Sequence, residues 1–425
     1  MTVNAQAATT AEKLKELVAE RYHADDLHAV EDACLKYLEL KNDDPDIIQT
    51  LGVCQRRLGK NAESVASLKK ARKLAPGNLN ILKSLSRSLF ANRDLSEYQQ
   101  SIADLFSMNA CSATMCIHSI QLFHRMGNKQ SAITSCEKYL TRYADNPHLL
   151  NLYSVALKNV GKLPDSVEVG RKSLALSLTH PSEEKAPKKR PVFNTAENLN
   201  LLWQTLAKLK KHGFVAFPTA GTLLGLVREK SLLSGDKDID IAIPFNDMTA
   251  VISVLEDDGW RQVGGSYSLS NPRQMVHQDY RLAIDLCGLL NEAESGKTIG
   301  GFWMEGIPEE WNRIVELPKP GVKAIDSPAG EVWWPNNPEE WLEAFYGENW
   351  RIPDTQFNTV ICARNLRDFS LLVECYAINK LFAHWWCGEI SKGLKIVNSV
   401  LFHRPDDELY LRLKQGLENA VVNKR

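Results

Sequence analysis

A repeat with a period of 34 residues runs through the first half of the chain, and it constrains the fold more than any other feature of the sequence. The register is set by four residue pairs that follow one another at this spacing: Leu51-Gly52, Leu85-Ser86, Ser119-Ile120 and Tyr153-Ser154. Seven residues after the second member of each pair stand Gly59, Arg93, Gly127 and Gly161. Residues 17–42 fit one more copy loosely.

Each unit contains two stretches with apolar residues at helical spacing and a turn between them, as in LGVCQRRLGKNAESVASLKKARKLAP at residues 51–76. In this respect the sequence resembles an array of tetratricopeptide repeats, with about five units over residues 11–178. One unit cannot bury its apolar face alone, so the units are expected to stack into an all-α solenoid with a concave groove. We interpret the groove as a docking surface for a protein or glycan partner; a passive scaffold or a surface for self-association is the alternative.

A linker separates the repeats from a second part of different composition. All ten Trp lie at or after Trp203, and the stretch HPSEEKAPKKRPVF at residues 180–193 is polar and punctuated by proline. A chain of 425 residues also exceeds one ordinary core. We therefore predict a multidomain protein with a repeat domain, a linker, an α/β domain and a helical extension, at residues 11–178, 179–193, 194–358 and 359–425 respectively.

Charge and apolar content limit the partners and the compartment. Lys and Arg total 51 against 52 Asp and Glu, which leaves no basic field for nucleic acid. The first residues lack the pattern of a signal peptide, and no uncharged apolar run is long enough to span a membrane. Nine cysteines without CxxC spacing fit a reducing compartment. The sequence predicts a cytoplasmic protein, in which the basic run 188–190 is a solvated hinge or, alternatively, a peripheral membrane contact.

The second half alternates between helical and extended patterns. Helices are expected at residues 198–213, 221–230 and 249–259, and strands at 214–220, 238–244, 260–265 and 280–290. This alternation indicates a mixed α/β domain. Residues 360–425 are expected to be mostly helical.

Three acids alternate along one expected strand. Side chains two residues apart share a face of a strand, so Asp236, Asp238 and Asp240 point one way and the intervening isoleucines the other. Like carboxylates on one face repel each other unless a cation lies between them, and Mg²⁺ or Mn²⁺ with its oxygen ligands is the common solution. The alternative is an edge strand with a solvated acidic face.

A further acid, Asp285, interrupts the apolar run RLAIDLCGLL. A buried carboxylate needs a partner, and two carboxylates on one strand with a third on a neighbour can hold a metal for phosphoryl transfer. We therefore predict a metal site of Asp238, Asp240 and Asp285, which are also the candidate catalytic residues. A core carboxylate satisfied by other groups, or a turn residue, is the alternative for Asp285.

Other residues are candidates for phosphate contacts. Gly221 and Thr222 follow one expected strand and open a helix, where backbone N–H groups can meet phosphate; an ordinary turn is the alternative. Arg228 is a candidate bidentate phosphate clamp or a surface arginine. His277 and Arg281 share the face of Asp285 if their strand is unbroken; His277 is a candidate base or phosphate contact, or a structural histidine.

Taken together, the motifs resemble those of the LicD/fukutin-like proteins, a branch of the nucleotidyltransferase superfamily. GTLLGLVR, DKDIDIAI and WWPNNPEEWLEAFYGENWRIP occur in order over roughly residues 195–355. The resemblance implies a nucleotidyltransferase-like fold and metal-dependent transfer of a phospho-alcohol, such as phosphocholine, ribitol phosphate or glycerol phosphate. The donor would be a cytidine-diphosphate-activated compound, the acceptor a hydroxyl of a glycan or surface polymer, and the product CMP.

Carried over to this sequence, the resemblance assigns Gly221, Thr222 and Arg228 to the donor side and Asp238, Asp240 and Asp285 to the metal. Lys237 stands where the family often has an acid, so no ligand is assigned there. Two alternatives remain: a nucleotidyltransferase that moves a nucleoside monophosphate, and a catalytically silent scaffold that acts through its repeats. The aromatic tract of residues 333–350 is expected in the core, with stacking on a cytosine or a sugar as the alternative.

Overall fold

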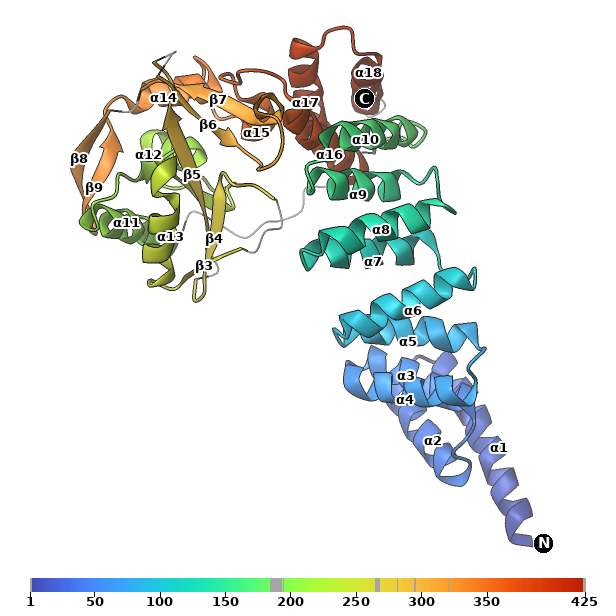
Figure 1. The fold of residues 1–425 in the computed structure, drawn as a ribbon. Helices are drawn as coiled ribbons and strands as arrows, with labels where there is room; N and C mark the ends of the chain where they lie inside the picture. The colour runs from blue at the N-terminus through green and yellow to red at the C-terminus, as the bar shows by residue number, and fades with distance from the viewer. Residues whose placement is uncertain are drawn as a thin grey trace. The chain divides into compact units, whose positions relative to one another are not determined.

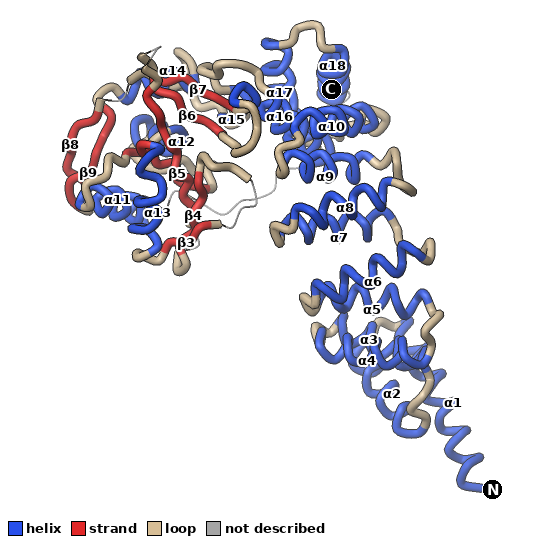
Figure 2. The backbone as a smooth tube through the Cα atoms, viewed as in Figure 1, coloured by secondary structure: helices blue, strands red, loops and turns tan. Residues whose placement is uncertain are grey.

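The computed structural model describes residues 2–183, 193, 195–263, 268–280, 282–293, 296–319 and 321–422. The chain divides into two compact units, Met1–Leu122 and Phe123–Arg425. The described part of the first unit is helical, and the named strands all belong to the second unit (Figure 2). The structure thus confirms the predicted order of fold classes, helical repeats first and a mixed sheet with helices after them.

The first unit is a stack of helix pairs (Figure 1). Asp44 and Asn78 begin two of the helices, because each side chain accepts hydrogen bonds from backbone N–H groups of the first turn. Apolar side chains such as Val30, Cys34 and Ile47 are buried between neighbouring helices. The elements are α1 (Thr2–His23), α2 (Leu27–Leu40), α3 (Pro45–Arg57), α4 (Asn61–Leu74), α5 (Leu79–Ala91), α6 (Leu95–Ser107) and the first part of α7 (Ala113–Arg125).

The period of the sequence is also a period of the backbone. A residue with positive φ lies between the two helices of each pair, and these residues are 34 positions apart: Asp25 (59°), Gly59 (81°), Arg93 (64°), Gly127 (68°) and Gly161 (79°). The left-handed conformation lets the chain reverse between antiparallel helices, and glycine adopts it most easily. Five helix pairs from α1 to α10 follow from this repeated turn.

The second unit continues the repeats with α8 (Lys129–Leu140), α9 (Pro147–Lys158) and α10 (Leu163–Ser177), and then changes to a mixed sheet. In that sheet β2 and β5 run parallel and the other neighbours antiparallel, in the order β1-β2-β5-β4-β3, with β6 on β5 and β7 on β6. The strands are β1 (Phe217–Pro218), β2 (Asp238–Pro244), β3 (Trp260–Gln262), β4 (Arg273–His277), β5 (Ala283–Asn291), β6 (Thr298–Phe302) and β7 (Arg313–Leu317). A separate hairpin consists of β8 (Val322–Ser327) and β9 (Gly330–Pro335).

The two faces of β2 have opposite characters. Ile239, Ile241 and Ile243 are fully buried against α11 (Ala196–Lys211) and α13 (Met248–Glu256), in the core of the α/β part. Asp238 and Asp240 lie on the other face, on the side of α12 (Ala220–Arg228). α14 (Pro338–Tyr346) packs with α12 and β7 around Trp341, Phe217 and Val315. The predicted alternation of Ile and Asp along β2 is thus observed, with the isoleucines in the core and the aspartates on the opposite face.

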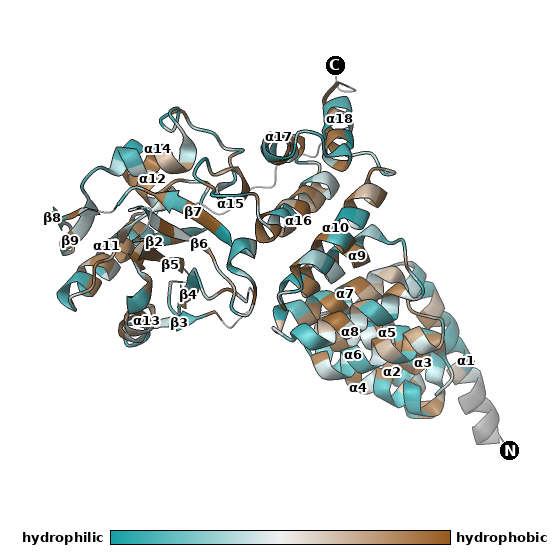
Figure 3. Ribbon diagram, turned by 45° about the horizontal axis from the view of Figure 1, so that its top comes forward, coloured by the Kyte–Doolittle hydropathy of each residue, from teal (hydrophilic) through white to brown (hydrophobic). Residues whose placement is uncertain are grey.

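The last helices pack on the last repeat helix. α15 (Thr359–Cys362), α16 (Leu371–Cys387), α17 (Ile390–His403) and α18 (Glu408–Val422) follow the sheet. α16 is largely apolar (Figure 3). Its residues Ile378 and Leu381 share a core with Leu174 of α10. The start of the predicted linker is held there too, because Trp385 donates from Nε1 to the His180 carbonyl and Ser182 donates to the Trp385 carbonyl. Residues 188–190 lie outside the described part of the chain.

Some predicted strands differ from the observed ones. The strand expected at 214–220 is only two residues long. The unbroken strand that would place His277 on the face of Asp285 does not form. β4 ends at His277, and a turn closed by the hydrogen bond from His277 N to Leu282 O precedes β5. Strands β6 to β9 were not predicted. The boundaries of the four predicted domains remain a prediction.

Candidate active site

Two carboxylates stand side by side on the central parallel strands. In the register of β2 and β5, Asp240 is the direct partner of Asp285, and Asp238 is the partner of Ala283. Paired residues of neighbouring strands point to the same face, so Asp285 faces the same side as Asp240 and Asp238. The sequence thus predicted correctly that two strands would bring these acids to one surface.

This surface is the floor of a hollow of about 610 Å³. Alternate residues of β5, namely Asp285, Cys287 and Leu289, contribute to the floor, and parts of β6 and β7 extend it. Asp236, Asp238 and Asp240 line it as well, together with Gly221 at the start of α12. Four carboxylates therefore share one concavity large enough for a small-molecule substrate.

Burial raises the pKa of all four carboxyls, and repulsion from neighbouring carboxylates adds to the rise for Asp236, Asp240 and Asp285. Burial is the largest cause for each. It acts together with the charge of Asp238 to raise the pKa of Asp236 and of Asp285 to about 6. Asp240, surrounded by the charges of the other three, has a pKa well above its ordinary value. The charges of Lys237 and Lys380, which also line the hollow, act in the opposite direction and lower the pKa of Asp238.

Several hydrogen bonds hold the acidic cluster in place. Gln274 donates from Nε2 to Oδ1 of Asp285 at 3.0 Å. The Gly221 backbone N–H hydrogen-bonds to the Asp240 carboxylate, which partly offsets the rise of its pKa. A Cβ atom on Gly221 would lie 2.9 Å from Oδ2 of Asp236, so glycine lets the start of α12 approach this carboxylate closely. The geometry of the cluster is thus built by α12, β2, β4 and β5.

The donor set fits a hard dication in its chemistry. Clustered carboxylate oxygens are the ligands that Mg²⁺ and Mn²⁺ prefer. Among the residues that the structure describes, no group of three or more His, Cys, Asp or Glu side chains has the spacing of a preformed metal site. Asp238, Asp240 and Asp285 are the residues that would hold the ion, with Asp236 beside them.

The other predicted site residues are not gathered at the hollow. Thr222 is buried, and its hydroxyl accepts a hydrogen bond from the Asp240 backbone N–H at 2.8 Å, so it fixes β2. Arg228 pairs with Glu229 at 2.8 Å and does not line the hollow. Of the predicted phosphate contacts, only Gly221 lines the hollow.

His277 lies away from Asp285 because the expected single strand is two. Its ring packs edge-on against Trp260 at 5.0 Å between centroids, and its Nδ1 accepts from the Asp279 N–H. In the antiparallel register of β4 and β5, the partner of Asp285 is Gln274. Since the strand is broken, the condition for a shared face of His277 and Asp285 is not met. Arg281 lies outside the described residues.

Several lining residues were not predicted. Arg313, Lys380, Tyr376 and Phe302 come from β6, β7 and α16. Their sequence contexts are apolar or helical and give no sign of a site, since only the tertiary fold brings them beside β5. Of the aromatic tract, Phe345 lines the hollow. Trp341 is a core residue that packs edge-on against Phe217 at 5.4 Å, as expected.

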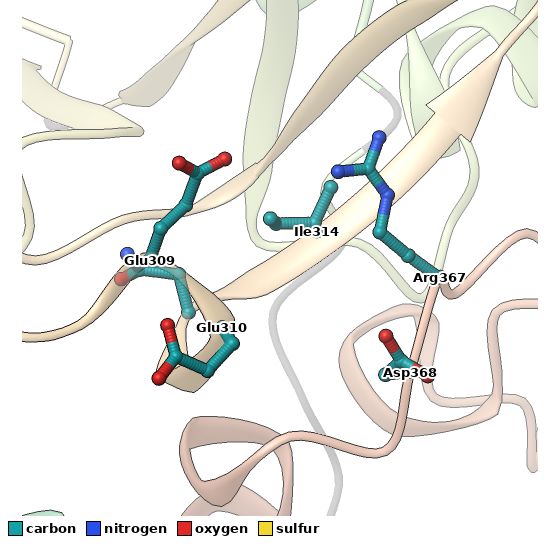
Figure 4. Close-up of a pocket in the computed structure, with 6 residues that line it drawn as sticks. Glu309, Glu310, Ile314, Arg367 and Asp368 are labelled. Atoms are coloured by element: carbon teal, nitrogen blue, oxygen red, sulfur yellow. The ribbon is translucent and has the colours of Figure 1, made fainter. Parts of the chain in front are cut away.

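A second hollow of about 240 Å³ lies beside β7 (Figure 4). In the figure the carboxylates of Glu309 and Glu310 and the guanidinium of Arg367 border it. Arg367 forms ion pairs with Glu316 at 2.9 Å and with Glu292 at 3.0 Å, so its charge is already compensated. The larger hollow, with its cluster of four acids, is the better candidate for an active site.

No protein-family model and no curated protein matches this sequence. Among solved structures, the chain is similar to a tetratricopeptide repeat protein from Parabacteroides merdae, with 17% identity, 39% of this chain and 66% of that chain covered, and a TM-score of 0.34. It is also similar to the MamA protein, with 16% identity, 43% of this chain and 100% of that chain covered, and a TM-score of 0.37. A third similar structure is YrrB, described as a TPR protein with an unusual peptide-binding site. The identity is 12%, 38% of this chain and 84% of that chain are covered, and the TM-score is 0.34.

Among the described residues there is no helix whose length and apolar character would let it cross a membrane.

Proposed function

We propose that the larger hollow is the active site of a metal-dependent phosphotransferase that moves a phospho-alcohol from a cytidine-diphosphate-activated donor to a glycan or polymer hydroxyl. The observation that carries the proposal is the register of Asp240 against Asp285 on parallel strands, with Asp238 on the same face. Like charges so close destabilise the fold unless a cation compensates them. The resemblance to LicD/fukutin-like proteins, based on three motifs, supplies the donor and acceptor classes.

The residues divide the chemical work. Asp238, Asp240 and Asp285 would hold the dication, which supplies charge neutralisation for the pyrophosphate when bound. The acceptor oxygen attacks the phosphorus that bears the alcohol, the bond from that phosphorus to the CMP oxygen breaks, and the hydroxyl proton leaves to a carboxylate. Asp285 either completes the ligands of the ion or, where Asp238 and Asp240 hold it, accepts this proton.

Two measurements test the proposal. Mg²⁺ or Mn²⁺ should raise the melting temperature, and cytidine diphosphate should raise it further in their presence, because ligands that bind only the folded state stabilise it. CDP-choline, CDP-glycerol and CDP-ribitol should then be screened for metal-dependent release of CMP with glycan acceptors. Absence of both a thermal shift and CMP release would reject the proposal. Release of pyrophosphate from a nucleoside triphosphate instead would identify a nucleotidyltransferase.

A second candidate function belongs to the repeats. Helix pairs joined by turns at a constant period occur in both units, and repeats of this kind commonly bind partners or associate with themselves. The first unit also exposes apolar side chains, including Leu35, Phe90 and Met108. Sedimentation of the full chain over a range of concentrations tests self-association, and a single monomeric species throughout would leave a heterologous partner as the remaining role.

A further inference from the structure

The floor of the larger hollow carries opposite charges on its two sides. The carboxylates lie on β2 and β5, and Arg313 is the first residue of β7, two strands further along the sheet. Both groups line the same cavity. Cys287 stands between them on β5, where its thiol feels the charges of Asp240 and Asp285 and also that of Arg313.

Arg313 is a buried cation without an acidic partner. Arg313 is only 3% exposed, and no carboxylate among the described residues pairs with its guanidinium. Nε donates to the Val360 carbonyl at 2.6 Å and Nη2 to the Thr359 carbonyl at 2.7 Å. Neutral carbonyls orient a guanidinium but do not neutralise it. Burial lowers the pKa of Arg313 to about 10, so the group still carries its charge at neutral pH.

Aromatic rings hold this cation in a fixed position. The guanidinium carbon lies 5.1 Å from the centre of the Phe302 ring, which is the strand partner of Arg313 on β6. Phe302 packs edge-on against Tyr376 at 5.4 Å, and the Lys158 ammonium lies 4.4 Å from the centre of the Tyr376 ring. Lys158 is itself 5% exposed. Phe302, Arg313 and Tyr376 line the hollow, so a buried cation held against packed aromatic rings faces it on this side.

We propose that Arg313 is the centre of an oxyanion subsite, which takes a phosphate or carboxylate group of the substrate on the β7 side of the hollow. Arg313 has one guanidinium nitrogen, Nη1, with no partner among the described residues, and Nη1 can donate a charge-assisted hydrogen bond. The bound group is either a phosphate of the donor or an anionic group on the acceptor. The subsite rests on the proposed function in taking the hollow as a substrate pocket, but it requires no metal.

The probe is inorganic phosphate at constant ionic strength and with a chelator present, so that no dication takes part. Phosphate should raise the melting temperature of the wild type and of Asp240→Asn equally. Arg313→Met should weaken phosphate binding, measured by calorimetry, about 10- to 100-fold, because a buried charged donor is lost. The matched control is Arg367→Met, which removes an arginine that does not line this hollow and should leave phosphate affinity unchanged.

A second variant protects the test from misfolding. Arg313→Lys keeps the charge but loses the planar fork, and about tenfold weaker phosphate binding is expected. Unchanged affinity in both Arg313 variants, or no phosphate binding by the wild type, would overturn the subsite. Phosphate binding that needs Mg²⁺ and is lost only in Asp240→Asn would also overturn it, while it would support the metal site.

The source of the oxyanion is decided by competition. With Ca²⁺ and saturating CDP-choline present, loss of the phosphate-induced shift would assign the subsite to a phosphate of the donor. An additive shift would assign it to an anionic acceptor. In either case Arg313→Met must reduce the phosphate part of the shift for the proposal to hold.

Discussion

At the scale of single residues, the acidic cluster makes the stability of the metal-free protein depend on pH. Asp236 and Asp285 have pKa values of about 6 in the folded state against 3.8 ordinarily, so the folded state binds these protons more tightly than the unfolded state. Their contribution to stability is fully present below about pH 4 and is lost as pH rises through 6.

We therefore expect the melting temperature of the wild type, measured with a chelator, to fall relative to that of Asp285→Asn between pH 4 and pH 7. The comparison with the variant isolates this carboxyl from all other titrating groups. Adding Mg²⁺ at pH 7 should remove most of the difference. Parallel curves for the two proteins across this range would mean that Asp285 is not destabilised by its neighbours.

A second prediction at this scale separates activity from stability. Asp240→Asn is nearly isosteric and removes one of four clustered charges. It should lower CMP release at least about 100-fold, since a metal ligand is lost, yet raise the free energy of unfolding without metal by about 1–2 kcal/mol. Urea denaturation and the CMP assay measure the two effects on the same sample. A variant that is both inactive and less stable would indicate a structural aspartate instead.

The sequence predicts side chains within one strand better than contacts between strands. Asp238 and Asp240 follow from the period of two alone, and Asp285 was conspicuous as an acid in an apolar run. Gln274, which bonds to Asp285, and Arg313 could not be predicted, because their positions depend on the register of β4 and β7. His277 was misplaced for the same reason, since the turn before Leu282 reverses the chain.

At the scale of elements, the repeats were predictable because one pattern returns in every unit. Helical spacing and a left-handed turn recur every 34 residues. A unit with an irregular pattern can therefore still be assigned from its position relative to the other units. Strands β6 to β9 have no such redundancy. β6 contains Gly300 and Gly301, and Gly301 must be glycine because a Cβ there would meet the Arg313 carbonyl oxygen at 1.9 Å. The strand conformation of β6 therefore depends on the neighbouring strands more than on the residues of β6 itself.

The repeated turn gives a prediction about stability. Arg93 has φ of 64°, while Gly59 occupies the equivalent turn with φ of 81° and open space around it. A left-handed conformation costs an L-residue about 1–2 kcal/mol, so Arg93→Gly should stabilise the first unit by about 0.5–1 kcal/mol after the extra chain entropy of glycine. Circular dichroism at 222 nm during urea unfolding measures this. Gly59→Ala is the matched control and should destabilise; equal effects of both changes would refute the argument.

At the scale of the whole molecule, contacts between residues that are far apart in the sequence hold the second unit together. The repeat pattern ends near residue 178, but α10 packs on α16, about 200 residues later along the chain. Arg171 of α10 bonds to Glu374 of α16 at 3.0 Å and to Asp407 at 2.8 Å, and Arg404 also pairs with Glu374. No local pattern in the sequence indicates these pairs, which is why the helical extension was predicted as a separate region.

This network gives an asymmetric prediction, because its members differ in burial. The Glu374 side chain is 1% exposed, whereas those of Arg171 and Arg404 are 31% and 36% exposed. Glu374→Gln leaves two arginines that water can solvate and should cost about 1–2 kcal/mol in the free energy of unfolding. Replacing Arg171 and Arg404 together by Met leaves the buried Glu374 carboxylate without its two cationic partners. This double change should lower the free energy of unfolding by about 3–5 kcal/mol.

Tryptophan fluorescence is the measurement of choice for these two variants. All ten Trp lie at or after Trp203, so the emission reports on Phe123–Arg425 and not on the first unit, while circular dichroism reports on both. The fluorescence midpoint in urea should therefore shift further for the double arginine variant than for Glu374→Gln. If Glu374→Gln proved the more damaging change, the carboxylate would be acting through contacts other than its two arginines, and the packing of α10 on α16 would need another explanation than this network.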